Sequence, residues 1–237
     1  MPNAIRYLAF DIETTAIIPA ERSDWRPYRP LGISCAATLA SDEPEPKVWH
    51  GRTSAGLPAA RMQRHEAAEL VDHLARMAND GYRILTWNGL AFDFDILAEE
   101  SGAKDVCTQL AWDHVDMMFH VFCRQGYRVA LDRAAQGMGI PGKPEGMSGI
   151  MAPHLWAEGR HQEVLDYVGQ DVRIALDLAR KCEKAGKFRW ITQKGTRQSF
   201  DLAGGWLTAK AAYALPKPDT SWIRNPVSRE EFIAWIG

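Results

Sequence analysis

The sequence has few cysteines and no stretch of apolar residues long enough to cross a membrane. Its four cysteines are scattered without a Cys-x-x-Cys pair, which argues against a zinc site or a disulfide framework and favours buried free thiols. No apolar run approaches the ~18 residues that a transmembrane helix needs. The first residues, MPNAIRYLAF, lack the basic start and small-residue cleavage site of a signal peptide. We therefore expect a cytoplasmic protein without membrane contact.

The chain also lacks an excess of positive charge. Its net charge of −2 argues against a protein that coats nucleic acid through bulk electrostatic attraction. A nucleic-acid enzyme is not excluded, because bound metal ions bring positive charge to the place where phosphate must sit. The 237 residues, of which 46% are hydrophobic and 24% charged, fit one large soluble domain or one domain with an extension.

Apolar periodicity predicts strands first and then strands that alternate with helices, which indicates an α/β or mixed sheet covered by helices. Strands are predicted over residues 6–13, 32–39, 47–50 and 83–87. Helices are predicted over residues 59–78, 93–101, 115–124, 131–137 and 160–185. Two further short strands, 188–192 and 196–202, predict a C-terminal β-hairpin. Ser228 and Glu231 form a capping box that predicts a last short helix.

Acidic residues stand in apolar surroundings at three separated places. Asp11 and Glu13 lie in YLAFDIETT, Asp93 lies in TWNGLAFDFDIL, and Asp171 lies in YVGQDVRIALDL. Side chains alternate between the two faces of a strand, so Asp11 and Glu13 point the same way. Buried carboxylates are costly unless something cationic compensates them. Four that converge are most simply explained by a pair of divalent metal ions.

Each acidic residue also has a structural interpretation. The two strand acids are an exposed pair under that interpretation, and Asp93 is a first-turn acid stabilised by the helix dipole. Asp95 competes with Asp93, but two residues correspond to about 200° around a helix, so both cannot face one site. Tyr167 and Asp171 are four residues apart and share a helical face, where a hydrogen bond between them is the alternative to metal binding.

The ligand chemistry favours a hard cation at these residues. Sets made only of carboxylates suit Mg²⁺ or Mn²⁺ rather than Zn²⁺. Two such ions, about 3.5–4 Å apart, can activate water and stabilise the leaving oxygen of a phosphodiester. A tyrosine with an ordinary pKa near ~10 is a neutral phenol at pH 7. Tyr167 is therefore suited to orienting an attacking water rather than to removing its proton.

The order of these motifs resembles the DEDD superfamily of 3′–5′ exonucleases, which have the ribonuclease H-like fold. The Tyr-x-x-x-Asp spacing of Tyr167 and Asp171 resembles the DEDDy branch, which includes the proofreading domains of family B DNA polymerases. The branch with a histidine would require it five residues before Asp171, where this chain has Asp166. The resemblance implies a ribonuclease H-like mixed sheet flanked by helices, an α/β fold, to which the chain adds a C-terminal β-hairpin and short helical extension.

The resemblance implies a role for each acidic residue. Asp11 would bridge two metal ions, Glu13 and Asp171 would hold the ion nearer the nucleophile, and Asp93, which the family pattern selects over its acidic neighbour, would support the second. These four acids and Tyr167 are the expected catalytic residues. The implied activity is metal-dependent 3′–5′ exonuclease cleavage that releases nucleoside 5′-monophosphates.

The expected substrate is the 3′ end of single-stranded DNA, as in DNA repair. An exoribonuclease that acts on RNA 3′ ends is the nearest alternative, because the contact that reads the 2′-OH cannot be located from sequence. A non-catalytic protein that binds nucleic-acid ends is a further alternative. The complete set of four carboxylates and a tyrosine counts against it, since a pure binder has no use for them.

The resemblance does not reach the end of the chain. We expect residues 1–187 to form the exonuclease domain and residues 188–237 to form an extension packed on the same domain. Trp206, Trp222 and Trp235 are expected to serve as packing for this extension. The chain contains no polymerase domain, so it would act as a stand-alone nuclease or with a protein partner.

Several residues are expected to contact the nucleic acid. Thr14, Thr15, Asn88 and Phe92 belong to the motifs and would lie near the terminal nucleotide. Two segments, 18–30 and 180–197, mix basic and aromatic side chains, which bind the phosphates and bases of single strands. The alternatives are a surface loop and a helix end whose dipole favours basic residues. The candidate phosphate contacts are Arg26, Lys143, Lys187, Arg189 and Lys194.

Three further residues that can ligate metals lie close together in the sequence. They are His114, Asp116 and His120, on a segment with a predicted helix. At these spacings only Asp116 and His120 share a helical face, so the three do not form one ligand set. We expect them to have structural roles.

Overall fold

A mixed five-stranded sheet forms the centre of the protein. The computed structural model describes residues 5–19, 21–22, 24–142 and 148–237. The strand order is β3-β2-β1-β4-β5. β1 pairs antiparallel with β2 and parallel with β4, β2 pairs antiparallel with β3, and β4 pairs parallel with β5. The strands are β1 (Tyr7–Thr14), β2 (Ile33–Ala40), β3 (Lys47–His50), β4 (Arg83–Thr86) and β5 (Val115–Asp116).

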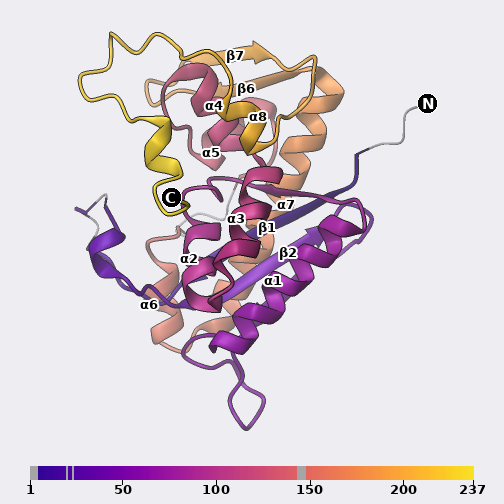
Figure 1. Ribbon diagram of the computed structural model, residues 1–237, viewed down its shortest axis with the longest axis vertical. Helices are drawn as coiled ribbons and strands as arrows, with labels where there is room; N and C mark the ends of the chain where they lie inside the picture. Colours follow the sequence, from indigo (N-terminus) through magenta and orange to yellow (C-terminus); the bar gives the residue numbers. More distant parts are fainter. Residues whose placement is uncertain (1–4, 20, 23, 143–147) are drawn as a thin grey trace.

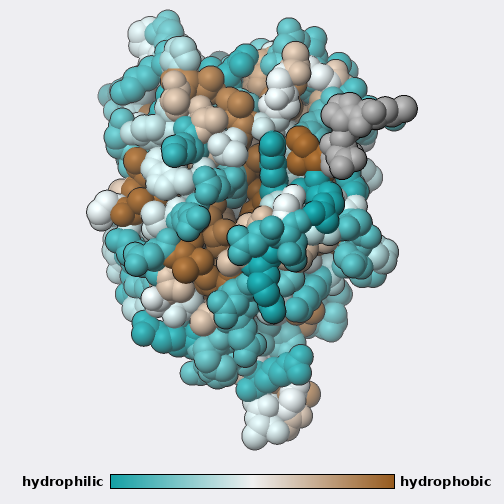
Figure 2. Space-filling view, turned by 45° about the vertical axis from the view of Figure 1, so that its right-hand side comes forward, coloured by the Kyte–Doolittle hydropathy of each residue, from teal (hydrophilic) through white to brown (hydrophobic). Residues whose placement is uncertain are grey.

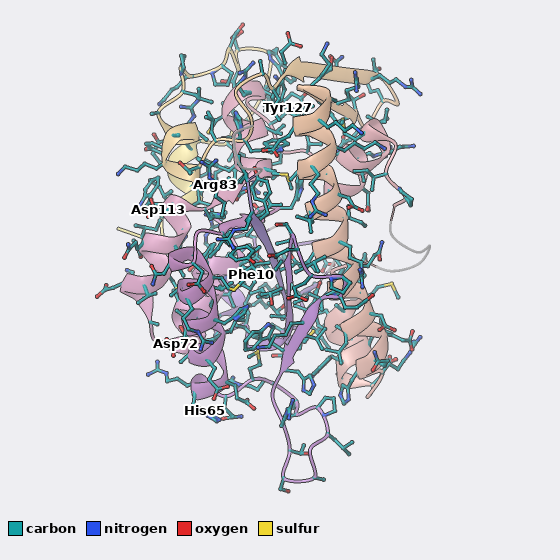
Figure 3. All side chains as sticks on the ribbon, turned by 90° about the vertical axis from the view of Figure 1, so that its right-hand side faces the viewer. Phe10, His65, Asp72, Arg83, Asp113 and Tyr127 are labelled. Carbon is teal, nitrogen blue, oxygen red and sulfur yellow. The ribbon has the colours of Figure 1, made fainter. Side chains whose placement is uncertain are left out.

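Helices cover both faces of this sheet, which confirms the predicted α/β fold. Figure 3 shows Phe10 at the middle of the sheet, with α1 on one side and α7 on the other. The α-helices are α1 (Arg64–Asn79), α2 (Asp93–Ser101), α3 (Lys104–Asp113), α4 (Met117–Gln125), α5 (Leu131–Met138), α6 (Ala152–Ala157), α7 (His161–Ala185) and α8 (Ala209–Tyr213). Their arrangement around the sheet can be followed in Figure 1.

The alternation of side chains along β1 directs its acidic residues toward α7. Leu8 and Phe10 pack in the core that contains α1 and α2. Tyr7 and Ala9 pack in the second core, together with one face of α7. Asp11 and Glu13 continue the side of β1 that carries Tyr7 and Ala9, because residues two apart in a strand share a face. Both acids line the same cavity, which confirms the prediction that they point the same way.

The structure corrects several predicted boundaries. The helix predicted from residue 59 begins at Arg64, because the backbone before it bonds to other segments, with the Met62 N–H donating to the Ile33 carbonyl over 2.7 Å. The helix predicted from residue 115 begins at Met117, since the two residues before it pair with β4 as a fifth strand. The helices α3, α6 and α8 were not predicted. With six and five residues, α6 and α8 are too short to show a helical periodicity.

The C-terminal residues pack against both cores. The predicted hairpin consists of β6 (Lys187–Ile191) and β7 (Arg197–Asp201), and it packs on α5 and α7. Trp206 is buried in the same core as the hairpin, and Trp235 is half-buried against the other core. Trp222 is exposed, so its prediction as a packing residue was wrong. The capping box at Ser228 is present, but it begins a 3₁₀ helix, Arg229–Phe232.

The surface is largely hydrophilic on the face drawn in Figure 2. A loop between β3 and α1 projects from the lower end of the molecule in Figures 1 and 2. All four cysteines are buried and free, which confirms the sequence prediction. Within the described residues, no helix has both the length and the apolar character needed to span a membrane.

The packing of α5 on the hairpin can be tested by substitution of two glycines that both lie inside helices, Gly137 in α5 and Gly169 in α7. A Cβ on Gly137 would come within 2.3 Å of the Trp190 Cα and 2.5 Å of the Arg189 carbonyl oxygen. We expect Gly137→Ala to lower the free energy of unfolding by about 1–3 kcal/mol, because overpacking outweighs the gain in helix propensity. Denaturant unfolding followed by circular dichroism measures the change.

Gly169 of α7 is the matched control. A Cβ there would meet only Pro46 side-chain atoms, at 3.6 Å and beyond, which is ordinary contact. Gly169→Ala should therefore be neutral or should stabilise the protein by up to about 1 kcal/mol through helix propensity. Equal effects of the two substitutions would contradict the tight packing of α5 on the hairpin.

Candidate active site

A cavity of about 460 Å³ lies where the end of β1 faces α7. All four acidic residues singled out in the sequence line it, although they come from three separate parts of the chain. The remaining lining residues are contributed by the loop after β1, the segment before α2, the start of α5 and the segment before α6. The fold therefore brings together three motifs that lie about 80 residues apart from one to the next along the sequence.

Three of the acidic residues form a cluster of oxygen ligands. Asp11, Glu13 and Asp171 each offer a carboxylate oxygen, and these oxygens lie within 4.8 Å of one another. Glu13 and Asp171 are buried, and Asp11 is half-buried. Negative charges this close repel strongly in a site partly shielded from water. A set made only of carboxylate oxygens fits a hard divalent cation, which would compensate their charge.

Asp93 lies beside this cluster and is attached to β1. It is the first residue of α2, and its Oδ1 accepts a hydrogen bond from the Ile12 N–H, 3.0 Å away. Ile12 stands between the two strand acids, so this bond holds the Asp93 carboxyl next to them. Burial raises the pKa of Asp93 to about 7, with further contributions from the Asp116 and Asp171 charges, while the Ile12 N–H lowers it.

Asp95 faces away from the cavity. Its carboxylate forms an ion pair with Arg29 and lines a neighbouring pocket that contains Arg26 and Trp235. The structure thus places the two acids of α2 on different sides of the helix, as the 200° estimate requires. Asp93 is the member of the pair that faces the carboxylate cluster.

Tyr167 lines the same cavity one helical turn before Asp171. Its side chain is buried. Burial and the negative charges of Asp171, Glu13 and Asp11 hold the pKa of Tyr167 well above its usual range, in that order of importance. The phenol is therefore protonated at neutral pH and carries an O–H that can donate a hydrogen bond.

A buried carboxylate outside the cavity holds the loop that leads to Asp93. Asp116 accepts hydrogen bonds from the backbone N–H groups of Asn88 and Leu90, each at 3.0 Å, and of Phe119 at 2.9 Å. Asn88 has a positive φ of 79°, a conformation that asparagine tolerates better than most residues. The role of Asp116 is thus to position the loop backbone.

The two histidines near Asp116 have separate structural partners. The ring nitrogens of His114 lie 2.6 Å from the Ala111 carbonyl oxygen and 3.0 Å from the Thr86 hydroxyl. The His120 Nδ1 accepts from the Leu207 N–H over 3.3 Å. These contacts agree with the structural roles expected from the sequence.

The rest of the cavity wall is mostly apolar, and Arg22 is the one basic residue among its described lining residues. Trp25 and Phe92 meet edge to face with ring centroids 5.4 Å apart. Arg22 lines the cavity, whereas the guanidinium of Arg26 contacts Asp24 Oδ1 at 3.3 Å and the Glu231 carbonyl oxygen at 3.2 Å. The structure therefore places Arg22, rather than the selected Arg26, at the cavity.

Sequence reasoning missed part of this wall. Trp87, Leu131 and Ile150 line the cavity and were not selected. The position of Trp87 directly before Asn88 was a usable signal. Leu131 and Ile150 have no local signal, because they reach the cavity only through the packing of the α5 and α6 regions.

The other expected nucleic-acid contacts are dispersed. Thr14, Asn88 and Phe92 line the cavity, and the buried Oδ1 of Asn88 accepts no hydrogen bond from the described residues. Thr15 instead donates its hydroxyl to the Leu31 carbonyl over 2.9 Å. Lys143 lies outside the described residues.

The basic residues of the hairpin lie far from the carboxylates. From Asp171 to the end of α7 at Ala185, the helix rises about 21 Å. Lys187 follows and pairs with Asp201 over 3.2 Å. Arg189 and Lys194 are exposed on the hairpin.

A family model described as the RNase_H superfamily matches residues 49–182, more than half of the chain. The protein belongs to the RNase H superfamily. The matched segment contains Asp93, Tyr167 and Asp171, and it begins after β1, which carries the first two acids. This RNase H-like fold has a mixed sheet, in which β1 lies between an antiparallel neighbour, β2, and a parallel neighbour, β4.

The comparison with solved structures found matches to a polymerase and to a nuclease. The family B DNA polymerase from the archaeon Pyrobaculum calidifontis has a TM-score of 0.56 and 23% identity, over 76% of this chain and 25% of the polymerase. Product-bound exonuclease I has a TM-score of 0.38 and 16% identity, over 76% of this chain and 43% of that protein. This RNase H-like chain thus spans a quarter to less than half of these proteins. No curated protein sequence matches it.

The raised pKa of Asp93 predicts how the stability of the metal-free protein depends on pH. A carboxyl whose pKa rises from 3.8 to about 7 on folding destabilises the folded state increasingly between these two values. Asp93→Asn keeps an oxygen for the Ile12 N–H and removes this penalty. Its gain in unfolding free energy over the wild type should grow by roughly 2–3 kcal/mol from pH 5 to pH 8.

Denaturant unfolding in EDTA at both pH values measures this gain. Asp166→Asn serves as the control, because Asp166 is exposed on the same helix as Asp171. A gain for Asp93→Asn that stays constant from pH 5 to pH 8 would contradict the burial of an ionisable Asp93.

Proposed function

We propose that the protein is a metal-dependent 3′–5′ exonuclease of the DEDDy type. The observation that carries the proposal is the cluster of Asp11, Glu13 and Asp171 oxygens within 4.8 Å of one another. Asp93 and Tyr167 line the same cavity. This set of four carboxylates and one protonated tyrosine has a use in phosphodiester hydrolysis that a purely binding protein does not need.

The acidic residues would hold two Mg²⁺ or Mn²⁺ ions. When bound, such ions supply an activated water and neutralise the charge that develops on the leaving oxygen. Under this proposal Asp11 would serve both ions, Glu13 and Asp171 would hold the ion on the side of the nucleophile, and Asp93 would support the other. The apolar core behind β1 and α7 fixes these carboxylates before substrate arrives.

Tyr167 would orient the attacking water through its phenolic O–H. Its raised pKa keeps the proton on the phenol, so it does not act as the base. The Asn88 Oδ1, which accepts no bond from the described residues, offers an acceptor to a hydroxyl of the terminal nucleotide. Arg22 brings a positive charge to the cavity, where phosphate would sit.

We propose a single-stranded DNA 3′ end as the substrate and nucleoside 5′-monophosphates as the products. The aromatic wall of Trp25 and Phe92 can stack on an unpaired base, which a duplex end does not offer. Residues 1–187 would form the catalytic domain, and residues 188–237 would extend its binding surface.

Removal of individual carboxylates tests the reaction. We expect Asp11→Ala and Asp171→Ala to reduce turnover by roughly 10³-fold or more while the fold is kept, because each removes a ligand from the cluster. The measurement uses single strands labelled at the 3′ or the 5′ end, in DNA and in RNA, with Mg²⁺ and then Mn²⁺. Robust cleavage by the Asp11→Ala protein would rule out the mechanism.

The pair of acids on α2 provides a matched control. Asp93→Asn should lose most of the activity, whereas Asp95→Asn should keep it, because Asp95 faces Arg29 in a different pocket. Circular dichroism spectra of both proteins check that the fold is unchanged. Equal losses for the two variants would place the second ligand elsewhere.

The basic hairpin generates a separate prediction about binding. Charge reversal at Lys187, Arg189 and Lys194 should weaken the binding of long single strands and flatten its salt dependence, because fewer counterions are released. Dinucleotides should bind unchanged, since the hairpin lies beyond the end of α7. Binding titrations at several salt concentrations measure both effects, and unchanged binding of long strands would remove the hairpin from the substrate path.

A further inference from the structure

Trp222 is the one exposed tryptophan among the nine of this chain, all of which are described. Its side chain is 66% exposed, whereas Trp190 and Trp206 of the same C-terminal segment are 2% exposed. Large exposed aromatic rings are unusual on protein surfaces that bind nothing, although a single one does not by itself define a site. The surroundings of Trp222 indicate what it contacts.

The Trp222 ring is held in place rather than left loose. Its Nε1–H donates to the Asp219 carbonyl over 3.1 Å, and its ring meets the Tyr127 ring at 5.8 Å and 77°. The backbone around it is a tight turn, in which the Ser221 N–H donates to Asp219 Oδ1 over 2.9 Å. A ring fixed in this way loses little conformational entropy when a ligand stacks on it.

The turn is anchored to the end of α4. Gly126 ends this helix with φ of 80°, and a Cβ there would lie 2.4 Å from the Thr220 methyl carbon. Tyr127 follows directly, and its ring also approaches the Trp190 ring of the hairpin at 6.5 Å. Figure 3 shows Tyr127 at the upper part of the molecule, beside α7. Tyr127 thus connects Trp222 to the hairpin.

The same segment leads from Tyr127 to the carboxylate cavity. Three and four residues further on, Ala130 and Leu131 form part of the cavity wall. Between them and Tyr127, the Val129 carbonyl accepts a hydrogen bond from the Trp87 Nε1–H over 3.1 Å, and Trp87 lines the cavity as well. Four residues reach at most about 14 Å. A nucleic-acid strand of a few nucleotides can therefore bridge the cavity and Trp222.

The charge of the C-terminal extension favours a nucleic acid over an apolar partner. Residues 188–237 contain seven lysines and arginines against four acidic residues, in a chain whose net charge is −2. Arg224, two residues after Trp222, is exposed. An exposed aromatic ring and an exposed basic residue in the same short segment match the combination of base face and phosphate in a single strand.

We propose that Trp222, supported by Tyr127, forms a stacking platform for an unpaired base of the substrate, several nucleotides before the 3′ end that occupies the cavity. This inference rests on the proposed function and deepens it. The platform makes the protein prefer single strands long enough to span both places, and it assigns a binding role to the C-terminal extension.

Binding measurements on Trp222→Ala test the platform. The probes are oligothymidylates with a 5′ fluorescein, one a dinucleotide and one a dodecanucleotide, and Ca²⁺ replaces Mg²⁺ to suppress turnover. Loss of one base stack should weaken dodecanucleotide binding by about 5- to 150-fold and leave dinucleotide binding unchanged. Trp222→Phe should restore much of the affinity. The salt dependence should stay the same, because no phosphate contact is lost.

Leu57→Ala is the matched control. Leu57 is 65% exposed, in the loop that projects between β3 and α1, and should not affect binding of either strand. Equal dodecanucleotide affinities of Trp222→Ala, Leu57→Ala and the wild type would overturn the platform. That outcome leaves the exonuclease proposal intact, provided that the wild type cleaves the strand. A wild type that neither binds nor cleaves it would overturn both, and Trp222 would then be a contact for a protein partner.

Discussion

The convergence of four carboxylates on one cavity is the constraint on which the rest of this structure depends. Asp11, Glu13 and Asp171 bring their oxygens within 4.8 Å, and Asp93 lies beside them with its pKa raised to about 7. Carboxylates this close together destabilise the folded state unless rigid elements hold them in place and a cation compensates their negative charge. The stability of the two apolar cores is what makes this arrangement possible.

Hydrogen bonds from backbone N–H groups to buried carboxylates hold the segments around the cavity in place. The Ile12 N–H holds Asp93 against β1, and Asp116 holds the Asn88 loop from the other side. In both cases the carboxylate accepts from a main-chain donor whose position is fixed by a strand or a turn. The start of α2 is thereby joined to the sheet independently of any bound metal.

The C-terminal extension continues both cores rather than forming a separate one. The hairpin places Phe188 and Trp190 in the core with α7, and Phe232 enters the core with α1. Its polar side carries basic residues away from the carboxylates, so the acidic site and the basic surface are separated along α7. Under the proposed function, only a long substrate strand would reach both the carboxylates and the exposed Trp222.

Local sequence patterns were enough to predict four of the five strands, the long helix and the acidic residues that line the cavity. Strand alternation oriented Asp11 and Glu13, and the four-residue spacing of Tyr167 and Asp171 placed them on one helix face, because both are local periodicities. The family resemblance already selected Asp93 over Asp95, and the structure agrees with that choice. That Arg22 rather than Arg26 lines the cavity, and that Trp222 is exposed, could be learned from the tertiary structure alone. Those outcomes depend on which distant segments pack together, such as Ile12 against α2 and Thr220 against Gly126, and no local pattern encodes such contacts.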